Sequence, residues 1–355
     1  MKKTYIYLAI LAVLLVLLYF TVLKDQLGSY SKKDTAFAVR DTTEIYTIIL
    51  SSLKGDTVAI TKDENNWLIN GKYEARPDAV SNLLRTMSQL EMKMPVAKSM
   101  HNNVIKDISG RRTKVEVYNK EGKKIKGYYI GDNSDELNGN FMLMEGSKHA
   151  FVVNIPGFEG FAGTVFFTDE TDWRSREVFA YAVDEIKEMD LIYPGKPDSS
   201  FTIKRNADKK FEFISPTKDP QAANPEIVQH YLKQFKLLNV ENFILEPYKK
   251  DSLLALVPVC ELKVTDIHDQ SRSIKIYYRP VNYRSKMQFT YENKPVEFDL
   301  DKFYGIYNND RDLAIVQNFV FGKLFVGPSY FYRQKPANEN MLIDKYLNET
   351  KHNSY

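Results

Sequence analysis

Two groups of polar residues have types and spacings that could support metal binding or acid–base catalysis. Asp266, His268 and Asp269 combine a histidine with carboxylates, the donor types that suit zinc and other divalent ions. Asp299 and Asp301 would share one face of a strand, as a paired general acid and base requires. Exposed strand acids have the same spacing, and no general-acid partner can be identified. We therefore expect no catalysis at this second pair.

Two further segments carry side-chain oxygens at every second residue, the spacing that opens a calcium loop. They are Asp132, Ser134 and Glu136, and Asn308, Asp310 and Asp312. A calcium loop of the EF-hand kind needs Gly at its sixth position and Glu at its twelfth. The sixth residue here is Leu137 or Leu313, so ordinary turns are the expectation.

The common catalytic signatures are absent from the sequence. There is no P-loop, no G-x-S-x-G and no G-x-G-x-x-G, and the histidines lack the H-x-x-x-H spacing of zinc enzymes. The histidines are His101, His149, His230, His268 and His352. We assign no catalytic, cofactor-binding or metal-binding residue and favour a non-enzymatic protein. An active site assembled from distant residues is left open.

Composition indicates a folded, β-rich protein without a nucleic-acid partner. The 355 residues are 43% hydrophobic, enough for two cores, and include 23 Tyr and 21 Phe, which favour strands. Lys and Arg number 49 against 46 Asp and Glu, so the surface has little net charge to attract nucleic acid. The lone Cys260 excludes an intramolecular disulfide, and we expect it in a core.

An uncharged run at residues 4–23 (TYIYLAILAVLLVLLYFTVL) predicts a membrane anchor. At about 1.5 Å per residue a helix of this length spans roughly 30 Å, the thickness of the hydrocarbon layer. No A-x-A site follows it, so we expect it to be retained as a single-pass helix in the lipid bilayer. Lys2 and Lys3 favour a cytoplasmic N-terminus, although Lys24 and later basic residues oppose this bias. We therefore expect a bacterial inner-membrane protein with the bulk of the chain in the periplasm.

Beyond the anchor, one pattern of strands and a helix occurs twice. A helix beginning near Pro77 and a second beginning near Pro225 have apolar faces 148 positions apart. The first face is Val80, Leu83, Leu84, Met87 and Leu90, and the second is Val228, Tyr231, Leu232, Phe235 and Leu238. Alternating strands flank both helices, with an offset that drifts between about 141 and 149. The pattern predicts an α+β fold: two similar antiparallel-sheet-plus-helix domains produced by internal duplication.

The duplication sets the expected domain boundaries and bears on the first polar group. We expect an anchor at 1–23, a stalk at 24–35, a first repeat at 36–170, a second repeat at 171–333 and a polar tail at 334–355. Asp266–Asp269 aligns with the turn at Asn119–Gly122, so its polar residues are expected to serve that turn and not a metal. Tyr330, Phe331 and Tyr332 are expected to close the second core, in preference to forming a patch for a partner or membrane.

Several segments, taken in order, resemble a known family. They are the N-terminal anchor, FAVRDTTEIYTIIL, WLINGKYEARPDAVSNLLRTM, VVNIPGFEGF and IVQNFVF. Together they resemble the domain of unknown function 4340 family in its membrane-anchored, Bacteroidetes-like form. The resemblance implies a place among auxiliary proteins of ABC-type gliding-motility transport systems. It implies no established activity and transfers no catalytic residue.

The sequence thus favours a membrane-tethered scaffold or accessory subunit of an envelope complex. Two alternatives remain open: a module that binds an envelope ligand such as a polysaccharide, and a hydrolase that uses carboxylates near Asp299 or Asp310.

Overall fold

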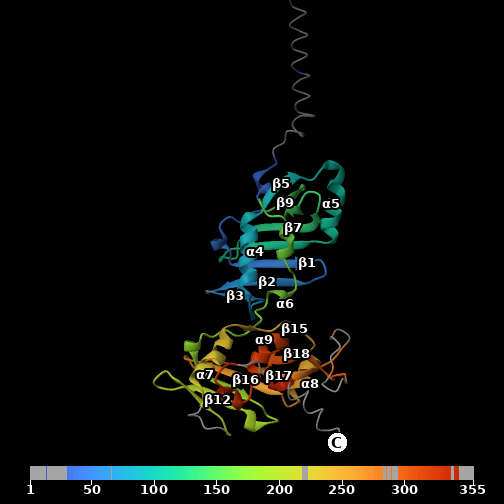
Figure 1. The fold of residues 1–355 in the computed structure, drawn as a ribbon. Coiled ribbons are helices and arrows are strands. Elements are labelled where there is room, and N and C mark those ends of the chain that lie inside the picture. Colours follow the sequence, from blue (N-terminus) through green and yellow to red (C-terminus); the bar gives the residue numbers. More distant parts are fainter. Residues whose placement is uncertain are drawn as a thin grey trace, which may run out of the picture. The chain divides into compact units, whose positions relative to one another are not determined.

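Helices and antiparallel sheets form two compact units, Met1–Ser175 and Arg176–Tyr355 (Figure 1). The mixed α+β class is as expected. The structure is a computed structural model that describes residues 13, 30–64, 66–217, 223–282, 285, 289, 295–336 and 340–343.

The apolar run at residues 4–23 lies, apart from Val13, outside the described residues. Within the described part of the chain, no helix has both the length and the apolar character needed to cross a membrane.

The first unit is built on one nine-stranded antiparallel sheet with the order β4-β3-β2-β1-β6-β7-β8-β9-β5. The strands are β1 (Thr47–Ser52), β2 (Thr57–Asp63), β3 (Asn66–Ile69), β4 (Tyr73–Glu74), β5 (Glu91–Pro95), β6 (Thr113–Tyr118), β7 (Lys124–Ser134), β8 (Gly139–Met144) and β9 (Ala150–Asn154). The helices are α3 (Lys32–Thr35), α4 (Pro77–Gln89), α5 (Lys98–Gly110) and α6 (Glu170–Trp173), with 3-10 turns at Thr42–Glu44 and Ala162–Val165.

Helix α4 covers one face of this sheet with the predicted apolar stripe. Pro77 occupies its first turn, where the missing N–H costs no hydrogen bond. Val80, Leu83 and Met87 are buried in the main core of the unit. Leu84 is only partly buried at the margin of that core, so our expectation that it matches fully buried Leu232 was too strong.

Helix α5 packs on the opposite face, over β7, β8 and β9. Alternation along the strands explains the placement, because successive side chains point to opposite faces. Tyr128 belongs to the main core, whereas its neighbour Tyr129 packs in a second cluster with Val104 and Ile108 of α5. This helix was not predicted from the sequence, because only Val104 and Ile108 of its residues are buried.

The rest of this second face, over β1, β2 and β6, is not covered by a helix among the described residues. Its side chains are mostly partly exposed and, apart from Ile49 and Tyr118, are polar or small. They are Thr47, Ile49, Ser51, Thr57, Ala59, Thr61, Lys114, Glu116 and Tyr118. We refer to these nine residues as the first open face.

The second unit repeats this plan with an eight-stranded antiparallel sheet in the order β13-β12-β11-β16-β17-β18-β19-β15. The strands are β11 (Ile186–Ile192), β12 (Phe201–Arg205), β13 (Phe211–Ile214), β15 (Asn242–Ile244), β16 (Cys260–Asp266), β17 (Ser271–Pro280), β18 (Phe298–Tyr307) and β19 (Asp312–Gln317), with β10 (Glu177–Phe179) and β14 (Leu238–Asn239) forming a separate pair. The helices are α7 (Pro225–Leu232), α8 (Pro247–Leu254) and α9 (Asn318–Phe321), with 3-10 turns at Val183–Glu185, Pro197–Ser199, Lys233–Lys236, Gly322–Leu324 and Pro328–Tyr332.

The second core lies between this sheet and α7. Tyr231, Leu232 and Cys260 are buried in it, as expected. Tyr330 and Phe331 also belong to this core, which confirms their structural role. Leu342 is buried there too, and the Tyr278 hydroxyl donates to its carbonyl oxygen at 2.9 Å. The segment expected to be a polar tail therefore contributes to the core.

The two sheets agree in strand order and in register. In the first unit Leu50 pairs with Val58 on one side and with Val115 on the other. In the second unit Leu191 pairs in the same way with Phe201 and Leu262. Helices α4 and α7 both follow the strand at the first edge of this order, β4 and β13, and α5 and α8 both follow the strand at the other edge, β5 and β15. The two sheets therefore correspond strand by strand, except that the first has the additional edge strand β4.

Replacing Leu83 by Ala should destabilise the first unit by about 2–5 kcal/mol, because the side chain is fully buried and a cavity would remain. Leu84→Ala, at the margin of the same helix face, should cost only about 1 kcal/mol. Trp67 and Trp173, the only two tryptophans, both lie in this unit, so tryptophan fluorescence during urea unfolding reports the effect. A larger shift for Leu84→Ala than for Leu83→Ala would show that the helix packs with a different face inward.

Candidate functional site

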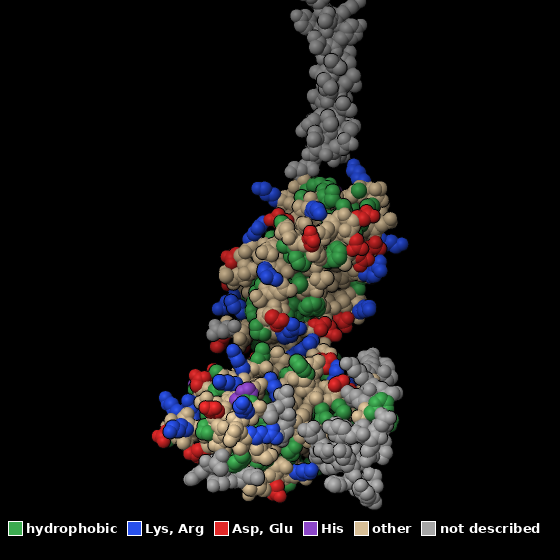
Figure 2. Space-filling model, in the orientation of Figure 1, with side chains coloured by type: hydrophobic (Ala, Val, Ile, Leu, Met, Phe, Trp, Pro, Cys, Tyr) green, Lys and Arg blue, Asp and Glu red, His purple; other side chains and the backbone are tan. Residues whose placement is uncertain are grey.

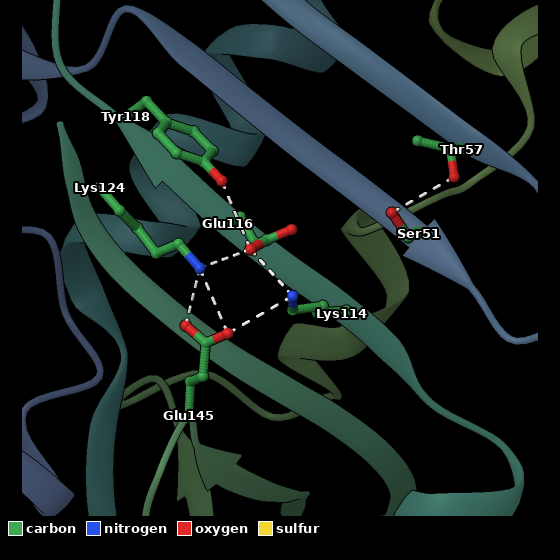
Figure 3. A network of polar contacts seen from close by, with 7 residues as sticks. All are labelled: Ser51, Thr57, Lys114, Glu116, Tyr118, Lys124 and Glu145. Atoms are coloured by element: carbon green, nitrogen blue, oxygen red, sulfur yellow. Dashed lines mark hydrogen bonds and ion pairs between the residues drawn. The ribbon is translucent and has the colours of Figure 1, made fainter. Parts of the chain in front are cut away.

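Four charged side chains form an interlocked cluster on and beside the first open face (Figure 3). Lys114 and Glu116 come from β6, Lys124 begins β7, and Glu145 follows β8. The Lys124 ammonium donates to Glu116 at 2.6 Å and to Glu145 at 3.0 Å. The Lys114 ammonium lies 2.9 Å from Glu116 and 3.4 Å from Glu145. Each charge therefore faces two opposite charges.

The ion pairs of this cluster shift the pKa values of Glu116, Lys114 and Lys124. Partial burial acts to raise the pKa of Glu116, but the two ammonium groups outweigh it and hold that pKa below its usual 4.5. The hydrogen bond to Glu116 raises the pKa of Lys114 and, together with the bond to Glu145, that of Lys124. Glu116, Lys114 and Lys124 therefore stay charged at neutral pH.

Gly127 on β7 makes room for the cluster. A Cβ atom at this position would collide with the Glu145 carboxylate and would lie 3.2 Å from its Cδ. Because glycine has no side chain, the Glu145 carboxylate can lie over the strand and reach both lysines. Ser51 and Thr57 continue the polar surface, with their hydroxyls 3.3 Å apart (Figure 3).

The second unit has an equivalent surface, the second open face, over β11, β12 and β16. Its residues are Glu188, Asp190, Thr202, Lys204, Glu261, Lys263 and Thr265. Lys204 pairs with Glu188 at 3.0 Å, and the Thr202 hydroxyl donates to Asp190 at 2.6 Å. The matched registers place Glu261 where the first unit has Lys114, and Lys263 where it has Glu116. The two faces are thus alike in shape and opposite in charge order at these positions.

Asp266 and its neighbours form a turn, as the repeat predicts. The Asp266 carboxylate accepts hydrogen bonds at 2.8 Å from the backbone N–H groups of His268 and Gln270. In the equivalent turn Asn119 accepts from the backbone N–H of Lys123 at 2.8 Å. Asp269 has a positive φ of 62°, where the first unit has Gly122.

The two strand acids have different environments. Asp299 is 3% exposed, forms an ion pair with Arg279 at 2.8 Å and accepts from the Ser285 hydroxyl at 2.9 Å. Asp301 is exposed, and its backbone N–H donates to Asp299. Both line a cavity of about 390 Å³ that also contains Glu241, whose carboxylate pairs with Lys302 at 2.7 Å. Sequence reasoning did not identify Arg279, because it lies on a different strand.

The two calcium-like segments each join a strand to a turn. Asp132, which pairs with Arg111 at 3.1 Å, and the buried Ser134 end β7, and the exposed Glu136 lies in the turn after it. In the other segment Asn308 and Asp310 lie in a turn and Asp312 begins β19. The Asn308 amide donates to Asp312 at 2.8 Å, and Lys275 of β17 pairs with Asp310 at 2.8 Å.

A larger cavity of about 800 Å³ lies in the first unit beside Asp132. Arg111, Arg112 and Asn133 line it, together with the buried Asn140, whose side-chain oxygen accepts from the backbone N–H of Gly163 at 2.8 Å. Its lining carries both charge signs, with Lys54 and the two arginines on one side of the balance and Asp56 and Asp132 on the other.

Two of the scattered histidines come together. The rings of His101 and His149 are 6.2 Å apart, and Tyr30 lies 5.4 Å from His149. Sequence spacing did not indicate this contact, since it depends on α5 packing beside β9. Among the described residues, no group of three or more His, Cys, Asp or Glu side chains is arranged to hold a metal ion.

Replacing Glu116 by Gln should lower the free energy of unfolding by about 1 kcal/mol at neutral pH, because two lysines lose a shared partner. The folded protein lowers the pKa of Glu116, so its contribution is present above the usual value of 4.5 and is lost as pH falls through the lowered value. The difference from the unsubstituted protein should therefore shrink in acid. Urea unfolding followed by tryptophan fluorescence at neutral and acidic pH measures it, with exposed Glu121→Gln as the control. A deficit that stays constant with pH would contradict the charge-based account.

Comparison with known proteins identifies the family and supplies no activity. The family model described as Domain of unknown function (DUF4340) matches residues 67–254, more than half of the chain. No curated protein matches significantly, and neither does any solved structure. The matched region covers much of both repeated units, including α4, α5, α7 and α8. The chain therefore belongs to the DUF4340 family.

Proposed function

We propose that this protein is a non-catalytic, membrane-tethered scaffold or accessory subunit of a bacterial envelope complex. The observation that supports this best is the pair of open faces. Each is a largely polar part of a sheet that the unit's own helices leave uncovered among the described residues, and it occurs at the same position in both units. Such a surface is rigid and can receive a partner without rearrangement.

The size of an open face favours a weak contact that depends on tethering. Three adjacent strands about 20 Å long and spaced about 4.8 Å apart present roughly 300 Å², less than half of one partner's share in a standard interface. One face alone would give modest affinity. Two faces on one chain, or confinement beside a membrane partner, would raise the effective concentration enough for occupancy.

The anchor supplies that confinement in this proposal. Residues 4–23 span the inner membrane once, and both units lie in the periplasm. The stalk at 24–35 sets the reach, at most about 3.5 Å per residue when extended. The resemblance to membrane-anchored, Bacteroidetes-like members supports a role beside an ABC-type transport or gliding-motility complex. The equal strand orders support an origin of the two units by duplication.

Binding of a small envelope ligand is a second candidate, favoured by the cavity of about 800 Å³ in the first unit. Its volume lies in the range of ligand sites, and Arg111, Arg112 and Asn133 could hydrogen-bond a polysaccharide fragment. A hydrolase has less support, because Arg279 and Ser285 already engage the Asp299 carboxylate.

A charge placed on the first open face should weaken the partner contact. In a strain lacking the native gene, Thr61→Arg should restore the phenotype poorly, because a long cation would stand on the β2 side of the face, opposite Thr47. Ser81→Arg, on the exposed side of α4, is the matched control and should restore it fully. Equal rescue by both variants would contradict the proposed use of this face.

The anchor and the polar candidates are tested in the same strain. A version lacking residues 1–23 should restore the phenotype poorly, since confinement is lost. Single changes to Ala at Asp266, His268, Asp299, Asp301, Asp310 and Asp312 should still restore it. If one of them abolished function while the protein stayed folded and membrane-bound, the enzyme or metal-binding hypothesis would replace the scaffold.

A further inference from the structure

We propose that one end of the first unit rests on an anionic lipid surface, and this inference depends on the membrane anchor proposed above. The surface comprises Tyr30, Met94, Met100, His101 and His149, with Lys98 and Lys148 beside them. We refer to these seven residues as the N-terminal patch. Strands β5 and β9 and helix α5, which supply most of it, lie together at one end of the unit (Figure 1).

Ring contacts and strand pairing bring the patch together. Tyr30 lies 5.1 Å from the ring of Phe151 and 5.4 Å from that of His149, which fixes the start of the described chain against β9. Phe151 pairs with Pro95 at the end of β5. His149 in turn lies beside His101 in the first turns of α5.

Three large apolar side chains of the patch are exposed to solvent. Tyr30 is 41% exposed, Met94 40% and Met100 46%. Figure 2 shows hydrophobic side chains at this end of the unit with Lys and Arg side chains around them. An apolar centre with basic neighbours is the composition of surfaces that rest in the headgroup layer, and Tyr and His add rings suited to that interface.

The short connection to the proposed anchor favours lipid as the binding partner of the N-terminal patch. Six residues lie between Leu23, the last residue of the apolar run, and Tyr30, and the seven steps along the chain span at most about 25 Å when extended. The patch is therefore held within that distance of the bilayer surface.

Charge points to anionic lipid. Exposed Lys32 and Lys33 add to Lys98 and Lys148, and each such lysine strengthens binding to anionic lipid about fivefold. Among acidic residues nearby, Asp34 is partly buried, and Glu91, at the other end of β5, pairs with Arg40 at 3.0 Å.

A fluorescent probe on the patch tests the contact in the full-length protein. Cys260 is fully buried, so Met100→Cys provides a single accessible thiol for an environment-sensitive fluorophore. Lys72→Cys, in the exposed turn between β3 and β4, is the matched control. Strand β3, which precedes this turn, lies seven strand positions from β5 in the sheet order, about 34 Å at 4.8 Å per position. Both variants are reconstituted alone into phosphatidylcholine vesicles with about one-third phosphatidylglycerol and a spin-labelled quencher lipid.

Quenching at position 100 should exceed that at position 72 several-fold. It should fall in pure phosphatidylcholine, and also when Lys98→Glu and Lys148→Glu are combined, with unchanged tryptophan-monitored unfolding showing that this variant is folded. Equal quenching at both positions in protein that floats with the vesicles overturns this inference and leaves the anchor intact. Quenching that does not depend on lipid charge overturns the anionic preference. Protein that does not float with vesicles contradicts the anchor, and this inference falls with it.

Discussion

Each sheet is wider than a single helix can cover, and this mismatch determines which parts of its faces are buried. Nine strands at about 4.8 Å spacing extend about 38 Å, whereas a 13-residue helix is about 20 Å long and about 10 Å wide. Helices α4 and α5 are therefore too small to cover both faces of the nine-stranded sheet completely. They lie on opposite faces, and β1, β2 and β6 keep one side open. The proposed partner surface is a direct consequence.

Side chains on the open faces must satisfy their polar groups without a covering layer. In the first unit this need is met by the four-charge cluster, which can lie flat because Gly127 has no side chain. Pairs this exposed contribute little stability individually, about 1 kcal/mol or less. Their main effect is to keep the sheet surface soluble and its side chains ordered. In the second unit the reversed charges of Glu261 and Lys263 meet the same need with a different pattern.

Much of the fold could be predicted from local patterns, and the rest depended on contacts between distant segments. Helix α4 and its counterpart α7 have a wide apolar stripe, and the paired strands alternate clearly, so the repeat and its register were found. Helix α5 buries only Val104 and Ile108, too few positions for a periodic signal, and α8 buries only Leu253. Leu342 was missed because its apolar segment is short and lies in a polar stretch.

The site residues divide in the same way. The turn role of Asp266 could be predicted, because the repeat aligns it with Asn119, and both side chains accept backbone N–H groups. The burial of Asp299 beside Arg279 could not be predicted, because the two residues lie on neighbouring strands that are joined by a long connection. The same holds for Glu116 with Glu145, which share Lys124 only after β7 pairs with β8.

The central claim, that the open faces receive a partner, is tested most directly by hydroxyl-radical footprinting of side chains in native membranes and in the purified protein. The account predicts that Tyr118 on the first open face loses reactivity in native membranes, while exposed Phe158, which lies outside that face, keeps it. Equal reactivity of Tyr118 in both preparations would contradict the claim.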